Sequence, residues 1–327
     1  MLTALMPMLH QTAEQNQRVL IVSVYSSKES PYPSQRESAV RGIARSSDEG
    51  KSWSSLGWKN ASTNSFCFHT ADSNRVFLAS DYGIFEARID ARSIKLISPW
   101  NLTMVKQIAM HPKNPTRIVA ATALGIFIST DNGESWIESS EGLPQTDGTF
   151  VSCVHFPNEN PNDILIGSEA GLFRSGDGGA HWKPDGLVGI KVRSLERHPK
   201  NNELFICATA ANGVYISTDG GKIWEEKHTG LPTLQMTAAY FDPSSEQILD
   251  ALSPGYGVLQ STDRGSTWNL RSRGLTNLQG TALCVDPHDS KTIFLATRNG
   301  MFVSRDGAQS WKAHSLSLAH VSSILIH

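Results

Sequence analysis

The stretch GIFISTDNGESW (residues 125–136) places Asp131, Gly133 and Trp136 at fixed offsets behind a short apolar run. Its second half recurs along the chain as SSDEGKSW (46–53), STDNGESW (129–136), SGDGGAHW (175–182), STDGGKIW (217–224), STDRGSTW (261–268) and SRDGAQSW (304–311). The aspartates of these boxes are Asp48, Asp131, Asp177, Asp219, Asp263 and Asp306. A single reaction site does not need so many copies of one turn, so the sequence predicts that the boxes are structural.

A repeat of nearly constant length runs through almost the whole chain. The last five boxes are separated by 46, 42, 44 and 43 residues, and the gap of 83 between Asp48 and Asp131 holds two units. GIFEARIDARS (83–93) fills that gap, with Asp90 near its middle. Repeats of about 40–45 residues are typical of four-stranded propeller blades. The sequence therefore predicts an all-β protein: a single seven-bladed β-propeller over residues 1–327, with four-stranded antiparallel blades and Asp-box turns.

Each unit also has the residue pattern of short strands separated by turns. The third unit reads VKQIAMH, RIVAAT, GIFIST and SWIESS, with Pro, Asn and Asp between the apolar runs. The chain ends on AHVSSILIH (319–327), which matches the innermost strand of the other units. We expect this segment to complete a first blade that begins near RVLIVSVY (18–25), although LTALMPMLH (2–10) is an alternative.

The residue types of the box suit a tight turn. The Asp carboxylate can accept hydrogen bonds from turn N–H groups, and the glycine two residues later supplies a positive φ. The tryptophan is expected to bury its ring against the adjacent sheet. Two units depart from the pattern: GIFEARIDARS lacks the Ser, Gly and Trp, which predicts the least rigid turn, and Gly307-Ala308 predicts a locally different turn in the last unit.

Charge and hydropathy exclude some functions. The formal charge of −2 gives no basic footprint for nucleic acid, and no apolar run approaches the roughly 18 residues of a membrane helix. The N-terminus has a short apolar stretch without a preceding basic residue, which is a poor signal peptide. We therefore expect no membrane insertion and a monomeric, cytoplasmic protein, or a secreted or periplasmic one if the N-terminus is processed or truncated.

Metal and redox motifs are missing from the sequence. Cys67, Cys153, Cys207 and Cys284 form no CxxC pair and lie in apolar runs, which favours buried reduced thiols while leaving a disulfide open. The eleven histidines are scattered, and HExxH, P-loop, GxSxG and Rossmann glycine patterns are absent. We expect no metal and no cofactor.

The pattern S-x-D-x-G-x-[ST]-W resembles the Asp-box, or BNR, repeat. With third strands that begin G-[IV]-[FY] and the exit Gly142-Leu143-Pro144, the units are similar to those of bacterial BNR-like propellers. That group includes sialidases, xyloglucan-active endoglucanases, the sortilin propeller and the photosystem II assembly factor Ycf48. The resemblance implies the fold, whereas these relatives perform unrelated functions.

Each relative implies features that can be sought here. Sialidases share an Arg-Ile-Pro motif, an arginine trio and six blades, and this chain has no Arg-Ile-Pro and seven units. Xyloglucanases use two propellers with a catalytic aspartate from each, and sortilin relatives add a cysteine-rich module. In size and layout the chain resembles the Ycf48 type, a single ring that binds a partner protein. That type is normally exported, and its basic patch is not recognisable in this sequence.

Ligands of propellers usually bind on the face built by the turns between second and third strands and by the connections between blades. These turns read SDYG (80–83), TALG (122–125), SEAG (168–171), TAANG (209–213), SPGYG (253–257) and TRNG (297–300). The corresponding turn of the first unit, SSKESPYPSQRESA (26–39), is longer than these, as expected of either a binding loop or a disordered one. The candidate ligand-binding residues are Tyr32, Arg36, Asp81, Tyr82, Glu169, Tyr256, Arg298 and Asn299. Ordinary solvated turns would have a similar composition.

Two functions fit these observations. The first is a non-catalytic propeller that recognises a protein or a glycan on this face. The second is a glycan-active enzyme, a hydrolase or lyase, with two carboxyl groups about 5–10 Å apart at the channel mouth. For that enzyme the candidates are Glu37, Asp81 and Glu169.

Overall fold

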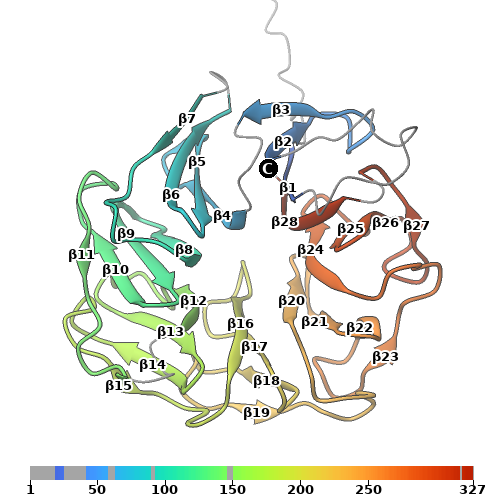
Figure 1. Ribbon diagram of the computed structural model, residues 1–327. Helices are drawn as coiled ribbons and strands as arrows, with labels where there is room; N and C mark the ends of the chain where they lie inside the picture. The colour runs from blue at the N-terminus through green and yellow to red at the C-terminus, as the bar shows by residue number, and fades with distance from the viewer. Residues whose placement is uncertain are drawn as a thin grey trace, which may run out of the picture.

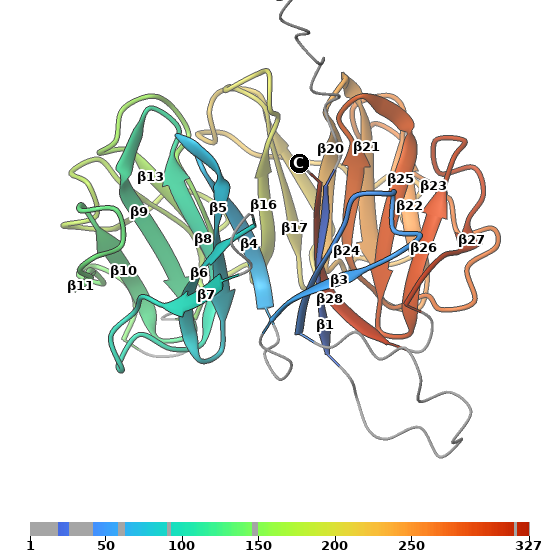
Figure 2. The same ribbon diagram turned by 90° about the horizontal axis from the view of Figure 1, so that it is seen from above.

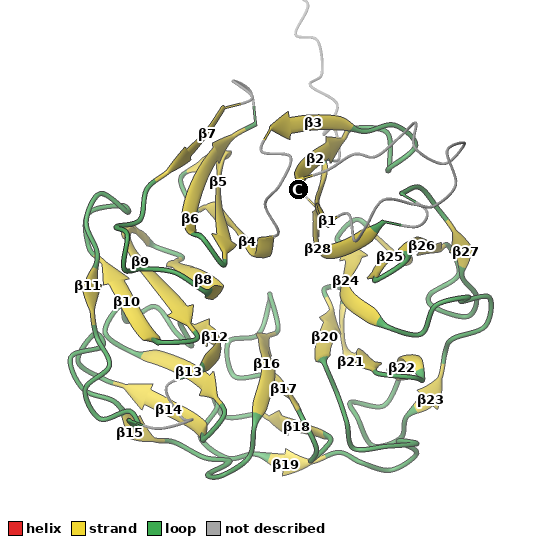
Figure 3. Ribbon diagram, viewed as in Figure 1, coloured by secondary structure: helices red, strands yellow, loops and turns green. Residues whose placement is uncertain are grey.

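The computed structural model describes residues 19–25, 42–57, 63–89, 93–145, 150–316 and 319–326. These residues form seven four-stranded antiparallel sheets arranged as a ring (Figure 1), and none of them is helical (Figure 3). The predicted all-β, seven-bladed propeller is therefore confirmed. No helix in the described part of the chain is long and apolar enough to cross a membrane.

The blades follow one another along the chain, each running from an innermost to an outermost strand. Blade 1 contains β28 (His320–Ile326), β1 (Leu20–Tyr25), β2 (Gly42–Ser46) and β3 (Ser54–Gly57). Blade 2 contains β4 (Thr63–His69), β5 (Asp72–Ser80), β6 (Gly83–Arg88) and β7 (Ser93–Leu96). Blade 3 contains β8 (Val105–His111), β9 (Asn114–Thr122), β10 (Gly125–Ser129) and β11 (Ile137–Glu138). Blade 4 contains β12 (Val151–His155), β13 (Ile164–Ser168), β14 (Gly171–Ser175) and β15 (Lys183–Pro184).

The remaining blades repeat this order. Blade 5 contains β16 (Val192–Arg197), β17 (Phe205–Thr209), β18 (Val214–Ser217) and β19 (Glu225–Glu226). Blade 6 contains β20 (Ala238–Asp242), β21 (Ser245–Ser253), β22 (Gly257–Ser261) and β23 (Asn269–Leu270). Blade 7 contains β24 (Gly280–Asp286), β25 (Asp289–Thr297), β26 (Gly300–Ser304) and β27 (Lys312–Ala313).

Strand β28 joins the two ends of the described chain. It pairs antiparallel with β1, from Leu20 opposite Ile326 to Tyr25 opposite His320, and so forms the innermost strand of blade 1 (Figure 1). The competing segment, residues 2–10, lies outside the described residues. Because β28 supplies the innermost strand, blade 1 has four strands, and the ring is held shut by backbone hydrogen bonds between segments about 300 residues apart.

The apolar core lies between the blades rather than inside any one of them. Each of the seven clusters of buried side chains in the described chain combines residues of two adjacent blades. In one of them, Val119 and Ile126 of blade 3 pack with Val154 and Ile166 of blade 4. A single blade therefore has no core of its own, and the blades stabilise one another by stacking.

Every box forms the same hydrogen-bonded turn. In blade 3, Ser129 Oγ donates to Asp131 Oδ1 over 2.8 Å and accepts from Gly133 N, while Ser135 N donates to Asp131 over 2.9 Å. Hydrogen bonds from the Ser135 side chain and backbone lower the pKa of Asp131 to about 2. The Ser-to-Asp bond recurs in all six boxes. The Asp carboxylates of the boxes thus accept hydrogen bonds from residues of their own turns.

The box glycine packs against the preceding blade. Gly179 has φ 93°, and a Cβ atom there would lie 2.2 Å from Ile128 Cδ1 of blade 3. The equivalent residue in blade 7 is Ala308, which adopts φ 67° and donates its N–H to Ser304 Oγ over 2.9 Å as the glycines do. The locally different turn expected at Gly307-Ala308 is therefore not found. The box of blade 2 cannot be compared, because residues 90–92 lie outside the described residues.

The box tryptophans fall into two groups. Trp182, Trp268 and Trp311 are buried, and their indole N–H groups donate to carbonyls of the preceding blade. The expected burial is wrong in degree for Trp53, Trp136 and Trp224, which are only partly buried.

The segment that leaves the preceding blade explains this difference. For the three buried rings this segment contains a glycine, and that glycine lies too close to the tryptophan backbone to accept a Cβ atom. The pairs are Gly142 with Trp182, Gly230 with Trp268 and Gly274 with Trp311. The residue before each of these glycines accepts a hydrogen bond from the tryptophan N–H. These three exits thus fix the outer strand of the next blade.

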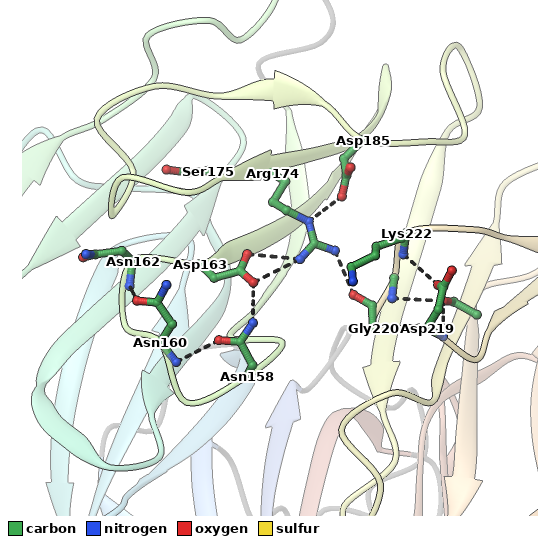
Figure 4. A network of polar contacts seen from close by, with 12 residues as sticks. Asn158, Asn160, Asn162, Asp163, Arg174, Ser175, Asp185, Asp219, Gly220 and Lys222 are labelled. Atoms are coloured by element: carbon green, nitrogen blue, oxygen red, sulfur yellow. Dashed lines mark hydrogen bonds and ion pairs between the residues drawn. The ribbon is translucent and has the colours of Figure 1, made fainter.

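Polar side chains add further links between blades. In Figure 4, Arg174 of β14 contacts Asp163 at 3.1 Å and Asp185 at 2.5 Å within blade 4, and its Nη2 donates to the Gly220 carbonyl in the box of blade 5. Arg45 reaches the Ile89 carbonyl of blade 2 from the equivalent position of β2. Each of these arginines therefore links the third strand of its own blade to the backbone just after the third strand of the next blade.

Candidate functional site: the central channel and the connection face

The two faces of the ring differ in how they are built. Because the strands of each blade alternate in direction, the boxes share one face with the turns between first and second strands. The opposite face, here called the connection face, carries the turns between second and third strands and the connections between blades. The side view in Figure 2 shows loops projecting at both faces.

The seven innermost strands surround a central channel with a cavity of about 430 Å³. Near the connection face, six of these strands contain a bulge, and the bulged residues that line the cavity are Asn64, Lys106, Ser152, Arg193, Thr281 and Ser322. Each bulge leaves one residue without a partner in the ladder. The bulges therefore place a ring of polar side chains near the mouth.

Several of these side chains bind the next blade. Asn64 Nδ2 donates to the Val105 carbonyl over 2.7 Å, Ser152 Oγ to the Val192 carbonyl over 2.8 Å, and Thr281 Oγ1 to the Val321 carbonyl over 2.5 Å. Ser322 Oγ donates to the Thr63 carbonyl over 2.9 Å. Part of the polar character of the channel is thus structural.

The two described carboxylate candidates at the mouth lie in separate ion pairs. Asp81 accepts hydrogen bonds from Asn64 over 3.0 Å and from Lys106 over 3.1 Å. Partial burial acts to raise the pKa of Asp81, but the bonds from Asn64 and Lys106 outweigh it, and the pKa lies below its usual value. Glu169 contacts Lys191 at 3.0 Å and Arg193 at 3.9 Å.

The other predicted ligand residues lie on exposed turns. Tyr82 is 64% exposed and Tyr256 is 40% exposed, and Arg298 and Asn299 are exposed on the turn between β25 and β26. Tyr32, Arg36 and Glu37 lie outside the described residues. The structure thus distributes the described candidates over blades 2, 4, 6 and 7.

Near the turn that carries Tyr82, the connection between blades 2 and 3 and the exposed turn of blade 3 carry large apolar side chains that the sequence analysis did not single out. Trp100 is 91% exposed, Leu124 54% and Met104 42%. The backbone of Met104 donates to the Asp81 carbonyl over 2.9 Å and accepts from Ala123 N over 3.1 Å, so this connection ties together the exposed turns of blades 2 and 3. We call Tyr82, Trp100, Met104 and Leu124 the aromatic patch. A sequence signal existed, because Trp100 is one of only two tryptophans outside a box.

The channel also contains a carboxyl group that sequence reasoning missed. Glu196 of β16 lines the cavity, and burial raises its pKa to about 7. The register of the ladders places Glu196 level with Tyr240, Cys284 and Leu325 of the other innermost strands. Aligning the repeats by strand register would have identified it as the one acidic residue at that level.

The described part of the chain contains no cluster of metal ligands and no disulfide. No group of three His, Cys, Asp or Glu residues there is placed to hold a metal ion. All four cysteines are free, and burial raises the pKa of Cys67 to about 11 and that of Cys284 to about 12. Free thiols were the expectation from the sequence.

Comparisons with known proteins show the fold. No family model matches the chain, and no curated protein matches it in sequence. The xyloglucanase of family GH74 from Xanthomonas campestris superposes with a TM-score of 0.67 at 15% identity, over 84% of this chain and 51% of that one. This chain therefore spans about half the length of that enzyme. YCF48 from Cyanidioschyzon merolae gives 0.60 at 15% identity, over 80% and 93%, and a YCF48 structure bound to D1 peptide gives 0.58 at 16%, over 81% and 93%.

These observations define the class of protein. It is a seven-bladed Asp-box β-propeller with the single-ring layout of the BNR-like, Ycf48-type proteins. Its structural neighbours include both enzymes and a binding protein, so the fold is compatible with either activity.

Proposed function

We propose that this propeller is a non-catalytic binding module that recognises a partner on its connection face, with the aromatic patch as the centre of the contact. The exposure of Trp100, 91%, is the observation that carries the proposal. Large apolar side chains gathered on a surface are typical of interaction sites, and tryptophan and tyrosine dominate binding hot spots.

The composition of the patch favours a polypeptide over a glycan. Trp100 and Tyr82 could stack on a sugar, but Met104 and Leu124 add flexible aliphatic surface, which suits protein side chains better. The Asp81–Lys106 ion pair beside the patch presents one charge of each sign to polar groups of a bound segment. YCF48, which has been solved with a peptide, offers a parallel in fold for this kind of ligand.

A glycan-active enzyme is the second candidate, favoured by the raised pKa of Glu196. A general acid of this kind needs a partner carboxylate across the substrate. Asp81 and Glu169 are held by Lys106, Lys191 and Arg193 instead. The position of these carboxylates therefore supports the binding function better than hydrolysis.

The proposal is tested by capture experiments with matched variants. The full chain, Trp100→Ala, Tyr82→Ala and Ile137→Ala are immobilised, exposed to a peptide library and to a glycan array, and compared. Ile137 is 70% exposed on the outermost strand of blade 3 and serves as the control. We expect the library to yield peptides whose affinity for the wild type and for Ile137→Ala is at least tenfold higher than their affinity for Trp100→Ala.

Other outcomes have clear readings. Trp100-dependent capture of glycans would make the partner a carbohydrate. Ligands that bind all four proteins equally well would show that the patch is not the site. Turnover of a captured glycan that is lost in Glu196→Gln would favour the enzyme.

A further inference from the structure

In the described part of the chain, the central channel contains an acidic group with no counter-charge. The charged residues that line the cavity are Lys106, Arg193 and Glu196. Lys106 lies 3.1 Å from Asp81, and Arg193 lies 3.9 Å from Glu169, so both cations have acidic partners at the mouth. Among the residues that the structure describes, none makes an ion pair or a side-chain hydrogen bond with the Glu196 carboxylate. An ionised carboxylate at this depth is therefore uncompensated.

We propose that the central channel binds a small organic ammonium ion rich in hydrogen-bond donors, with the Glu196 carboxylate as its anchor. The site is separate from the aromatic patch, and its occupancy does not depend on the function proposed above.

The wall of the channel offers acceptors to such a ligand. The hydroxyl groups of Ser152, Thr281 and Ser322 donate their protons to backbone carbonyls of the next blade. Their oxygens therefore present lone pairs to the cavity and not protons. An amine or hydroxyl group can donate to these oxygens, whereas the two cationic side chains of the same ring, Lys106 and Arg193, are already paired with Asp81 and Glu169.

The size of the cavity argues for an organic ligand instead of an inorganic ion. A volume of about 430 Å³ lies within the range of small-molecule sites and far exceeds what one bare cation fills. Phe66 and Tyr240 also line the cavity and supply apolar surface for a carbon skeleton. A polyhydroxylated amine combines the charge, the donors and the size that this channel accommodates.

The surroundings of Glu196 make binding depend on pH. Its titratable neighbours are Cys153 of β12, Tyr240 of β20 and Cys284 of β24, whose pKa values are all raised by burial and by Glu196. His155 of β12 has a pKa lowered by burial to about 4, and Lys106 of β8 and Arg193 of β16 lie nearer the mouth. Near neutral pH, Glu196 is thus the group in this set that changes charge.

The experiment uses glucamine and sorbitol, which differ only in an ammonium group against a hydroxyl. Binding to the full chain is measured by isothermal titration calorimetry at pH 8 and pH 6, where the amine stays protonated. We expect glucamine to bind at least tenfold more tightly than sorbitol at pH 8. Because the pKa of Glu196 is about 7, the affinity for glucamine should fall about tenfold at pH 6.

Two variants make the test specific. Glu196→Gln should remove the preference for glucamine, and Glu138→Gln, on the exposed outermost strand of blade 3, should keep it. A carbon-13 titration of the Glu196 carboxyl should also show its pKa falling when glucamine is added. This second readout does not depend on how well the variant folds.

Three results would overturn the proposal: equal binding of the two probes, unchanged preference in Glu196→Gln, or a Glu196 pKa that ignores glucamine. Heat from sodium or potassium chloride alone that depends on Glu196 would instead assign the channel to an inorganic ion. None of these results would affect capture by the aromatic patch.

Discussion

At the residue scale, the box glycine serves two needs at once. Its positive φ closes the turn, and its missing side chain admits an apolar group of the preceding blade, as Ile128 shows at Gly179. Ala308 meets the first need at the cost of a left-handed alanine, which raises the local energy by about 1–2 kcal/mol. The box is therefore as much a contact between blades as a turn within one.

We expect Gly179→Ala to lower the free energy of unfolding by about 2–3 kcal/mol, because left-handed strain adds to a clash in a packed interface. Gly176→Ala in the same turn is the control, since a Cβ atom there meets nothing within 4 Å. Urea unfolding measures both variants. Equal effects would mean that the preceding blade does not restrict the box glycine.

Asp250 should make stability fall as pH rises. It is 1% exposed, Gln260 donates to its Oδ1, and burial raises its pKa to about 7. Between its unfolded and folded pKa values, about pH 4 to 7, the native state binds more protons, so the stabilisation is present below this window and lost above it.

Asp250→Asn should therefore resemble the wild type at about pH 4 and be more stable than it at pH 8, by about 2–4 kcal/mol. Chemical denaturation across this range gives the comparison. Parallel stability curves for the two proteins would show that Asp250 is not protonated on folding.

At the element scale, the short outer strands depend on the exit of the blade before them. These strands have only two residues in blades 3 to 7, too few to hold a position alone. Where the preceding exit carries a glycine against the tryptophan backbone, the ring is buried. Trp224 instead bonds to the Gly221 carbonyl in its own turn over 3.0 Å. The connection between blades, more than the box itself, decides how deeply the tryptophan is buried.

Truncating the tryptophans should reveal this difference. We expect Trp268→Ala to cost about 3–5 kcal/mol of unfolding free energy, because a fully packed ring is removed. Trp224→Ala should cost distinctly less, since its ring is only partly buried. Thermal and urea unfolding of the two variants provide the test, and a reversed order would contradict the role given to the exit.

At the scale of the whole molecule, the ring separates stability from recognition. The box face and the interfaces between blades hold the repeated residues, and the connection face holds those that vary. Closure by β28 makes blades 1 and 7 neighbours. The seven innermost strands therefore surround one channel, and Glu196 lines it. The aromatic patch and the channel can then bind different partners on one rigid frame.

The sequence by itself determined the number of blades and their antiparallel strands, because both follow from a repeat whose period and alternation can be read locally. It offered two candidates for the strand that completes blade 1, residues 319–327 and 2–10, and the pairing of β28 with β1 in the structure identifies the first of them. It also indicated the connection face, since residues vary there within a fixed frame. Only the tertiary structure decided that Asp81 and Glu169 are in ion pairs, that Trp100 is exposed and that no described cation pairs with Glu196. These properties depend on which side chains from distant blades meet around the axis, and the register and stacking of seven sheets set that arrangement.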